Sequence, residues 1–205
     1  IDLYQLHWPE RITNTFGKRD FDSSVNDKWE ENFENVLFNL KTIISSGKVR
    51  QIGISNENPW AFMKYLELSK KKLPKTITIQ NPYSLLNRLF EIGNSEICMR
   101  EDVGLLAYSP LGFGVLSGKY LNGNMPKDSR LKLFPNLSRF SGENSMKATS
   151  MYYNISKKYN LSLTQMALSF VNSRPFVTSN IIGATKLNQL KENIESINID
   201  LSEDA

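Results

Sequence analysis

The stretch that decides the fold spans residues 47–56: Gly47-Lys48-Val49-Arg50-Gln51-Ile52-Gly53-Ile54-Ser55-Asn56. Val49–Ile54 is a short apolar run of the kind that forms a buried strand, although Gly53 interrupts it. Gly47 predicts the end of a preceding helix, because glycine is favoured just beyond a helix C-terminus. Ser55 and Asn56 follow the strand, where hydroxyl and amide side chains could simply cap the next helix. A buried strand set between two helices is typical of a parallel sheet.

The alternation of short apolar runs with longer amphipathic stretches continues on both sides. The other predicted strands are Ile1–Leu6, Thr76–Gln80, Val103–Tyr108 and Phe176–Ile182. The predicted helices are Asn26–Ser45, Pro59–Ser69, Leu89–Arg100, Asn144–Tyr159, Ser162–Asn172 and Leu187–Ile197, with loops at 10–25 and 109–143. This order predicts an α/β fold with helices covering a parallel sheet. Since no glycine-rich dinucleotide fingerprint follows any strand, a barrel is favoured over a Rossmann fold.

The number of strands predicts an incomplete (β/α)8 TIM barrel. A complete barrel needs eight strands and about 250 residues, whereas this chain has 205 residues and five predicted strands. The chain begins inside a strand pattern and ends at Leu201–Ala205, which looks like the capped start of another helix. We therefore expect one barrel domain over residues 1–205 that holds about strands 4–8 and is truncated at both ends.

The composition is that of an ordinary soluble protein, with 40% hydrophobic and 22% charged residues. No apolar run reaches the roughly 18 residues that cross a bilayer, and the first residues do not form a signal peptide. One cysteine, Cys98, and one histidine, His7, argue against disulfides and metal sites and fit a reducing cytoplasm. The net charge of +4 is scattered, apart from Lys70-Lys71-Lys72 at a predicted helix end. We expect a cytoplasmic protein with neither nucleic acid nor membrane as a partner.

Polar side chains follow each predicted strand. In barrel enzymes the chemistry gathers at the carboxyl ends of the strands. The five strand ends are His7, Ser55-Asn56, Gln80-Asn81, Tyr108-Ser109 and Gly183-Ala184. Together they provide an imidazole, amides, hydroxyls, an aromatic ring and a helix N-terminus. This set suits a carbonyl substrate beside an amide-bearing ring and a phosphate.

Five motifs, in order along the chain, resemble the aldo-keto reductase superfamily. Residues 2–9, which end in His7-Trp8-Pro9, resemble the fourth strand of that family, and residues 47–56 resemble the fifth. The later matches are residues 80–84 (sixth strand), 106–112 with 117–120 (seventh strand and its loop), and 183–185 with 189–193 (last strand and helix). Residues 81–88 and 134–143 resemble the bacterial Tas-type reductases in particular. The resemblance implies reduction of a small-molecule aldehyde or ketone with NADPH as the cofactor.

The resemblance also implies a role for individual residues. His7 would be the catalytic histidine, donating a hydrogen bond to the substrate carbonyl oxygen, although a lone histidine is more often structural. The nicotinamide carboxamide would be bound by Ser55, Asn56 and Gln80. Tyr108, which could otherwise be ordinary core, would stack on the nicotinamide ring.

The remaining implied contacts are to the phosphates and the adenine. The loop over the pyrophosphate would contribute Ser109, Pro110, Leu111, Gly112, Gly114, Gly118, Lys119 and Arg130, where the alternative is an ordinary flexible loop. The 2′-phosphate and adenine end would be held by Gly183, Thr185, Gln189, Glu192 and Asn193, at a helix N-terminus and along one helix face. Many family members carry arginine where this chain has Gln189, and Thr185 with Lys186 could compensate.

Other functions stay open at this point. The family's proton donor is a tyrosine assisted by a lysine and an aspartate on earlier strands, so the resemblance implies that these three are not in this chain. We therefore expect the chain alone to lack reductase activity and to fold poorly. Alternatives are a cofactor-binding regulatory module on the same scaffold, an inert fragment, and an isomerase or lyase on a generic barrel. The sequence predicts neither the substrate nor the oligomeric state.

Overall fold

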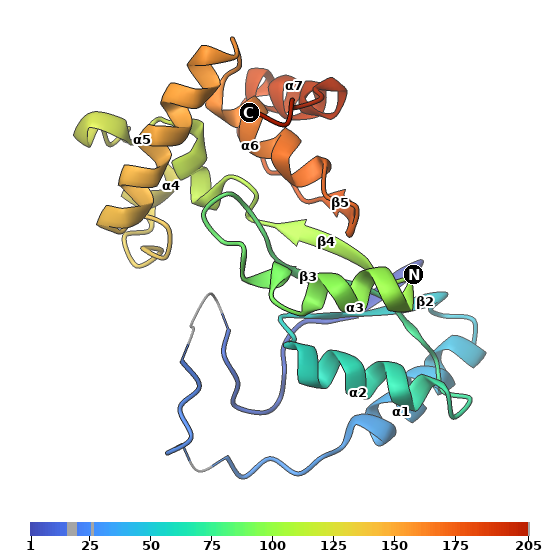
Figure 1. The fold of residues 1–205 in the computed structure, drawn as a ribbon. Helices are drawn as coiled ribbons and strands as arrows, with labels where there is room; N and C mark the ends of the chain where they lie inside the picture. Colours follow the sequence, from blue (N-terminus) through green and yellow to red (C-terminus); the bar gives the residue numbers. More distant parts are fainter. Residues whose placement is uncertain (16–19, 26, 205) are drawn as a thin grey trace. The chain divides into compact units, whose positions relative to one another are not determined.

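A computed structural model describes residues 1–15, 20–25 and 27–204. Its five strands form one sheet in chain order: β1 (Leu3–Leu6), β2 (Gln51–Ser55), β3 (Thr76–Pro82), β4 (Gly104–Tyr108) and β5 (Val177–Asn180) (Figure 1). The first two pairings are parallel, with Leu6 opposite Ile54 and Ile54 opposite Ile79. Consecutive strands that pair with their neighbours and are joined by helices confirm the predicted α/β class with successive βα units.

The chain divides into two compact units. The first comprises Ile1–Asn81 and Leu89–Leu106, and the second comprises Pro82–Arg88 and Ala107–Ala205. The division therefore falls within β4, between Leu106 and Ala107, and at the end of β3, between Asn81 and Pro82. Each unit is described by itself below.

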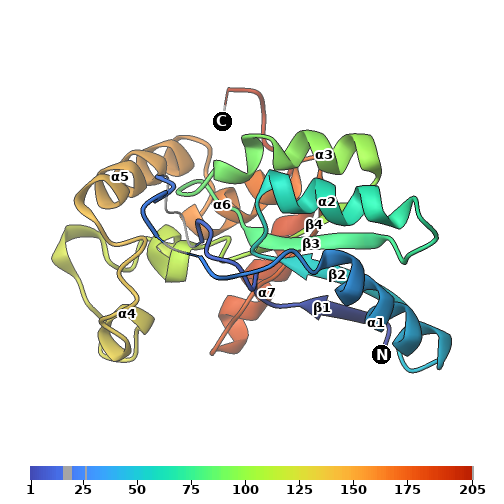
Figure 2. The same cartoon turned by 90° about the horizontal axis from the view of Figure 1, so that it is seen from below.

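Three helices cover the sheet residues of the first unit: α1 (Phe33–Ser45), α2 (Pro59–Ser69) and α3 (Asn94–Glu101). Helix α2 begins at Pro59, and the side chain of Asn58 caps it by accepting the backbone N–H of Ala61 at 3.2 Å. Helices α1 and α2 lie side by side, and α3 packs on α2 (Figures 1 and 2). Their buried faces include Phe33, Leu37, Leu40, Phe62, Tyr65 and Leu66.

Two predicted helices of the first unit differ from the structure. The helix predicted over Asn26–Ser45 starts at Phe33, and Asn26 itself lies outside the described residues. Before this helix, the carboxylate of Asp27 accepts the backbone N–H groups of Ile12 and Trp29, so the segment is tied down in a non-helical course. The helix predicted over Leu89–Arg100 is interrupted after a short 3₁₀ turn, η1 (Leu89–Glu91), because Gly93 adopts φ 98°, a conformation that glycine tolerates.

The second unit is mainly helical around the end of β4 and β5. Helix α5 is Glu143–Lys158, α6 is Leu163–Asn172, and α7 is Leu187–Glu195, continued by the 3₁₀ turn η4 (Ser196–Asn198). Helix α6 starts with a capping box in which Ser162 and Gln165 bond each other's backbone N–H. The strand predicted over Phe176–Ile182 is shorter, at Val177–Asn180.

The segment predicted as a long loop, residues 109–143, contains short helical turns. These are η2 (Gly112–Ser117), η3 (Leu121–Gly123) and α4 (Arg130–Leu133). They pack around a small core of their own formed by Val115, Tyr120, Leu131 and Phe140. The part of the chain predicted as loop at 10–25 includes residues 16–19, which lie outside the described residues, as does Ala205.

One face of β1–β3 carries polar side chains, and it leads to the strand ends where the candidate site residues lie. Residues two apart in a strand share a face, so Gln5, Gly53 and Thr78 lie level on it, whereas Ile54 and Ile79 lie on the opposite, buried face. Gln5 donates to Thr78 Oγ1 at 3.3 Å across Gly53. A Cβ at position 53 would lie 2.2 Å from that oxygen, which explains why glycine interrupts the strand.

Candidate active site

Four predicted site residues meet at the carboxyl ends of β1–β3, and we call His7, Ser55, Asn56 and Gln80 the strand-end cluster. The hydroxyl of Ser55 donates to the backbone carbonyl of Gln80 at 2.6 Å, and the backbone N–H of Asn56 donates to the same carbonyl at 3.1 Å. The amide nitrogen of Asn56 donates to the carbonyl of His7 at 2.9 Å and to Ser55 Oγ at 3.2 Å. The structure thus brings together residues separated by up to 73 positions in the chain.

The Ser55–Asn56 turn is fixed and buried. The two residues are 4% and 7% exposed, and Asn56 adopts φ 60°, a left-handed conformation that asparagine tolerates better than most residues. Both protons of the Asn56 amide nitrogen are used within the cluster, so its side chain is held in one orientation. The simpler reading of these residues as helix caps is wrong, because Asn58 caps α2.

Gln80 and His7 differ in exposure. Gln80 is half-buried, and its amide nitrogen donates to Gln5 Oε1 at 2.7 Å, which extends the polar face of the sheet. The side chain of His7 is exposed and stacks on Trp8, with ring centroids 4.9 Å apart. Because the backbone of His7 is held by Asn56, its imidazole stands at a fixed strand end where a solvent-borne molecule can reach it.

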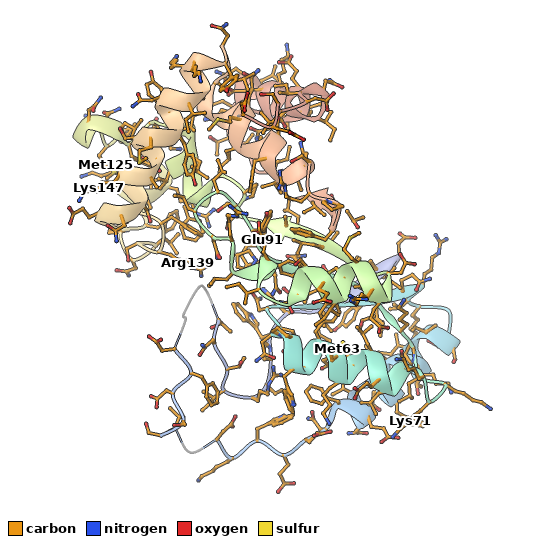
Figure 3. All side chains as sticks on the ribbon, viewed as in Figure 1. Met63, Lys71, Glu91, Met125, Arg139 and Lys147 are labelled. Carbon is orange, nitrogen blue, oxygen red and sulfur yellow. The ribbon has the colours of Figure 1, made fainter. Side chains whose placement is uncertain are left out.

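Tyr108 ends β4 in the second unit and is paired with a residue that the sequence did not single out. This residue is Arg139, which lies on the segment between α4 and α5 (Figure 3). The Tyr108 hydroxyl is hydrogen-bonded to the Arg139 side chain. Burial raises the pKa of Tyr108, and the hydrogen bond and charge of Arg139 partly offset that rise. The Arg139 guanidinium lies over the rings of Phe113 and Phe140, at 5.7 and 5.6 Å from their centroids.

The turn that follows β4 relies on left-handed residues. Ser109, Gly112, Gly114 and Gly118 have φ of 55°, 51°, 86° and 78°. At Gly114 a Cβ would lie 2.8 Å from the Lys119 ammonium nitrogen, so the missing side chain lets Lys119 fold against the loop backbone. Within the same loop, Pro110 is buried, and the carbonyl of Leu111 accepts the N–H groups of Gly114 and Leu116 at 2.9 and 3.1 Å.

Arg130 lies on the same loop as these glycines. Its guanidinium sits 4.6 Å from the centroid of the Phe113 ring, which Arg139 also contacts. Tyr120 ties the start of α4 to this loop, since its hydroxyl accepts the backbone N–H of Leu131 at 3.3 Å. The loop thus packs on a small buried core of its own and places two guanidinium groups against the ring of Phe113.

The residues predicted for the adenine end lie around the start of α7. Gly183 and Thr185 are exposed ahead of the helix, and the Gln189 side chain accepts the Thr185 N–H at 3.2 Å and its hydroxyl at 3.3 Å. Glu192 accepts a short hydrogen bond from Ser162, the cap of α6. Asn193 is 5% exposed. Glu192 thus ties α7 to α6, and Asn193 faces the interior of this unit.

A buried ion pair lies beside the strand-end cluster, and no motif in the sequence indicates it. Arg11 donates to Glu57 through NH1 at 3.1 Å and through NH2 at 2.6 Å, and the two side chains are only 7% and 4% exposed. Glu57 directly follows Asn56 in the chain. Charged residues carry no hydropathy signal of burial, and 46 positions separate the partners, so only the three-dimensional structure reveals the pair.

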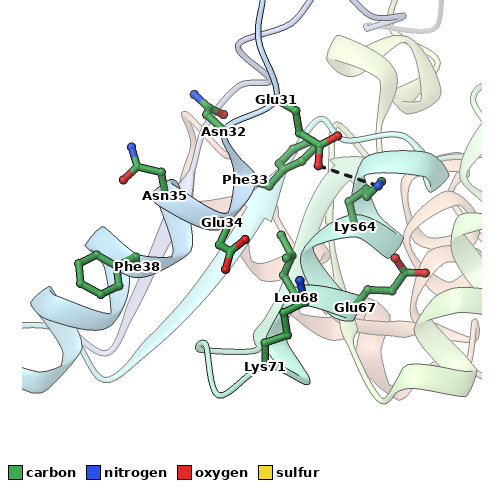
Figure 4. A pocket seen from close by; sticks show the side chains of 10 residues that line it. All are labelled: Glu31, Asn32, Phe33, Glu34, Asn35, Phe38, Lys64, Glu67, Leu68 and Lys71. Atoms are coloured by element: carbon green, nitrogen blue, oxygen red, sulfur yellow. Dashed lines mark ion pairs between the residues drawn. The ribbon is translucent and has the colours of Figure 1, made fainter.

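One groove of the first unit does not coincide with these residues. It has a volume of about 780 Å³ and lies between α1 and α2, lined by Glu31, Phe38, Lys64, Glu67 and others of mixed charge (Figure 4). A second groove of about 350 Å³ runs between β5 and α7 and includes Asn193. The candidate site is therefore defined by its side-chain chemistry rather than by the size of a hollow.

Several other kinds of site find no support in the described part of the chain. No group of three or more histidine, cysteine or acidic side chains is placed to hold a metal ion among residues 1–15, 20–25 and 27–204. Burial raises the pKa of the Cys98 thiol to about 12, which makes it a poor nucleophile. Over the same described residues, no helix combines the length and the apolar character needed to cross a membrane.

Comparison with known proteins defines the class. The sequence pattern of the Aldo/keto reductase family matches residues 1–205, the whole chain. The chain belongs to this family, and its five-stranded parallel sheet is part of the family's (β/α)8 barrel.

Three individual proteins of known name are similar to this chain. Protein tas of Escherichia coli is 49% identical over 205 residues, covering all of this chain and 59% of the relative. An aldo-keto reductase of Babesia bovis is 39% identical over 95% of this chain and 73% of its own length. L-glyceraldehyde 3-phosphate reductase of Escherichia coli is 35% identical over 78% of this chain and 47% of its own length. The chain thus spans 59% of the length of Protein tas, and the predicted resemblance to Tas-type reductases is confirmed.

Proposed function

We propose that the full-length gene product that contains this chain is an oxidoreductase that reduces aldehyde or ketone carbonyls with NADPH. The observation that carries the proposal is the strand-end cluster, in which an exposed imidazole adjoins buried, pre-oriented hydroxyl and amide groups. Family membership supports the same reaction class. The reductase names of two relatives point in this direction as well.

The chemistry of the cluster fits a nicotinamide carboxamide. That group carries both N–H donors and a carbonyl acceptor, so it needs partners of both kinds. Ser55, Asn56 and Gln80 carry hydroxyl and amide side chains. Hydrogen bonds within the cluster fix Ser55 and Asn56 before any ligand arrives, and Gln5 holds the side chain of Gln80. In the second unit, the cations Lys119 and Arg130 beside Gly112, Gly114 and Gly118 suit pyrophosphate oxygens.

In this proposal, each residue has a limited task. The bound dinucleotide would supply the hydride. His7 donates a hydrogen bond to the substrate carbonyl oxygen and stabilises the negative charge that develops there. Tyr108 offers its ring as a stacking surface for the nicotinamide, and Arg139 holds the Tyr108 hydroxyl. Proton donation is not assigned to any residue of this chain.

The preference for NADPH over NADH gives a test at the start of α7. We expect Thr185, Lys186 and Gln189 to hold the 2′-phosphate, because Thr185 and Lys186 are exposed there and Thr185 is already paired with Gln189. Replacing Lys186→Met in the full-length gene product should weaken NADPH binding by on the order of tenfold, as expected for a lost charge-assisted contact, and leave NADH binding unchanged. Quenching of tryptophan fluorescence by each dinucleotide measures both affinities.

Lys191→Met is the matched control, since Lys191 is exposed on the same helix. It should alter neither affinity. Equal weakening of NADPH and NADH by Lys186→Met would show that position 186 does not contact the 2′-phosphate. Failure of the unmodified gene product to bind either dinucleotide would refute the proposed function itself.

A further inference from the structure

The Arg11–Glu57 ion pair lies between two segments of the strand-end cluster. Arg11 comes four residues after His7, and Glu57 comes immediately after Asn56. Their two hydrogen bonds, at 3.1 and 2.6 Å, are the forked arrangement of a guanidinium and a carboxylate. This geometry fixes direction as well as distance, so it sets the position of the segment after β1 against the turn after β2.

Both partners are anchored by further contacts. The Arg11 guanidinium lies 5.1 Å from the ring centroid of Trp60 and 5.8 Å from that of Phe33. Its NH2 group also donates to Asn58 Oδ1 at 3.3 Å, the same oxygen that caps α2. Arg11 is therefore enclosed by a carboxylate, an amide and two aromatic rings.

Glu57 is held from the other side through its backbone. Its carbonyl accepts the side-chain amides of Asn81 at 2.9 Å and Asn94 at 3.4 Å. Asn81 directly follows Gln80, so these bonds tie the end of β3 to the residue after Asn56. The loop that carries Ser55 and Asn56 is thus clamped by Arg11 on one side and by β3 on the other.

Such a clamp matters because Asn56 is held in a left-handed conformation, at φ 60°. Asparagine tolerates that conformation better than most residues, but it still carries a cost that the surrounding contacts must offset. The amide of Asn56 also supports the backbone of His7. A shift of the Glu57 segment would therefore move the carboxamide-binding groups and the histidine together.

We propose that Arg11 and Glu57 are a positioning pair for the nicotinamide end of the site. The pair sets the geometry of Ser55 and Asn56 and thereby the affinity for the carboxamide, without touching the cofactor itself. This inference rests on the proposed function. It differs from a purely structural role in one respect: its loss weakens binding of the nicotinamide half of the dinucleotide and spares the adenosine half.

The test compares two ligands with the full-length gene product and isothermal titration calorimetry. The ligands are NADPH and adenosine 2′,5′-bisphosphate, which lacks the nicotinamide half. In the double variant Arg11→Met with Glu57→Gln, both charges are removed, so neither is left buried without its counterion. We expect NADPH to bind on the order of tenfold more weakly, as a displaced contact group would require, and the bisphosphate to bind within about twofold of the unmodified protein.

Two further variants keep the test decisive. Arg11→Lys retains the charge but cannot form the fork, so it should fold and show an intermediate loss of NADPH affinity. Arg50→Met is the matched control, because Arg50 pairs with Asp2 at the same 2.6 Å but with both side chains about four-fifths exposed, at 79% and 84%. It should change neither affinity.

The outcomes separate the two proposals. If the unmodified protein binds neither ligand, the proposed function fails. If it binds both, and Arg11→Lys and the double variant keep NADPH affinity, the positioning role is wrong. Equal weakening of NADPH and the bisphosphate would also overturn it, because that pattern indicates a general loss of structure. Should the double variant fail to fold, the Arg11→Lys result decides alone by the same criteria.

Discussion

Replacing His7→Leu in the full-length gene product should lower kcat for carbonyl reduction by about 10²–10³-fold, the usual cost of one lost donor to a developing oxyanion. The cofactor affinity should stay unchanged, because the structure assigns only the backbone carbonyl of His7 to the strand-end cluster. That carbonyl remains in the variant, so Asn56 keeps its partner. Steady-state kinetics with saturating NADPH, together with the dissociation constant for NADPH, measure both effects.

His7→Gln is the companion variant, since its amide keeps an N–H donor near the same place. It should recover part of the lost kcat. A leucine variant that retains more than half of the activity would remove His7 from the reaction. A leucine variant that loses NADPH affinity and kcat together would instead make the residue part of the binding surface.

Replacing Phe62→Ala should lower the free energy of unfolding by about 3–5 kcal/mol, the usual cost of emptying a buried phenylalanine site. Phe62 is fully buried, at 0% exposure, on the face of α2 that also buries Tyr65 and Leu66. Helix α2 packs against both α1 and α3, so the cavity would open at the centre of the first unit. Urea denaturation of the full-length gene product followed by circular dichroism gives the value.

Phe38→Ala provides the comparison for that loss, because Phe38 lies on α1 with 60% of its surface exposed. Its effect should stay within about 0.5 kcal/mol, as for most surface positions. Similar effects of the two substitutions would mean that α2 does not bury the face described above.

The local sequence pattern is enough to predict the strands. It fails where contacts between distant residues determine the boundary or conformation of an element. The apolar runs predicted all five strands, and Asn58-Pro59 at the start of α2 follows ordinary helix-start chemistry. The apolar period continues through Trp29 and so predicts too early a start for α1, whereas Asp27 ties that segment to Ile12. Gly53 could be seen to interrupt a strand, but its reason, the approach of Thr78, needs the neighbouring strand.

In the candidate site, too, the local sequence predicts some residues, and only distant contacts reveal the others. The strand-end rule identified His7, Ser55, Asn56 and Gln80, which the structure brings together. Arg11 falls in a predicted polar loop because a charged residue predicts exposure, yet its carboxylate and aromatic partners bury it. The local sequence around Arg139 likewise gives no indication of its hydrogen bond to Tyr108.

The most direct test of the central claim is a crystal structure of the full-length gene product with NADP⁺, the oxidised cofactor, bound. The account predicts the nicotinamide carboxamide at hydrogen-bond distance, about 2.7–3.2 Å, from side chains of Ser55, Asn56 or Gln80. The imidazole of His7 should face the open side of the ring, where a carbonyl substrate would lie. A dinucleotide whose nicotinamide ring rests against other residues, with the strand-end cluster left in solvent, would contradict the account.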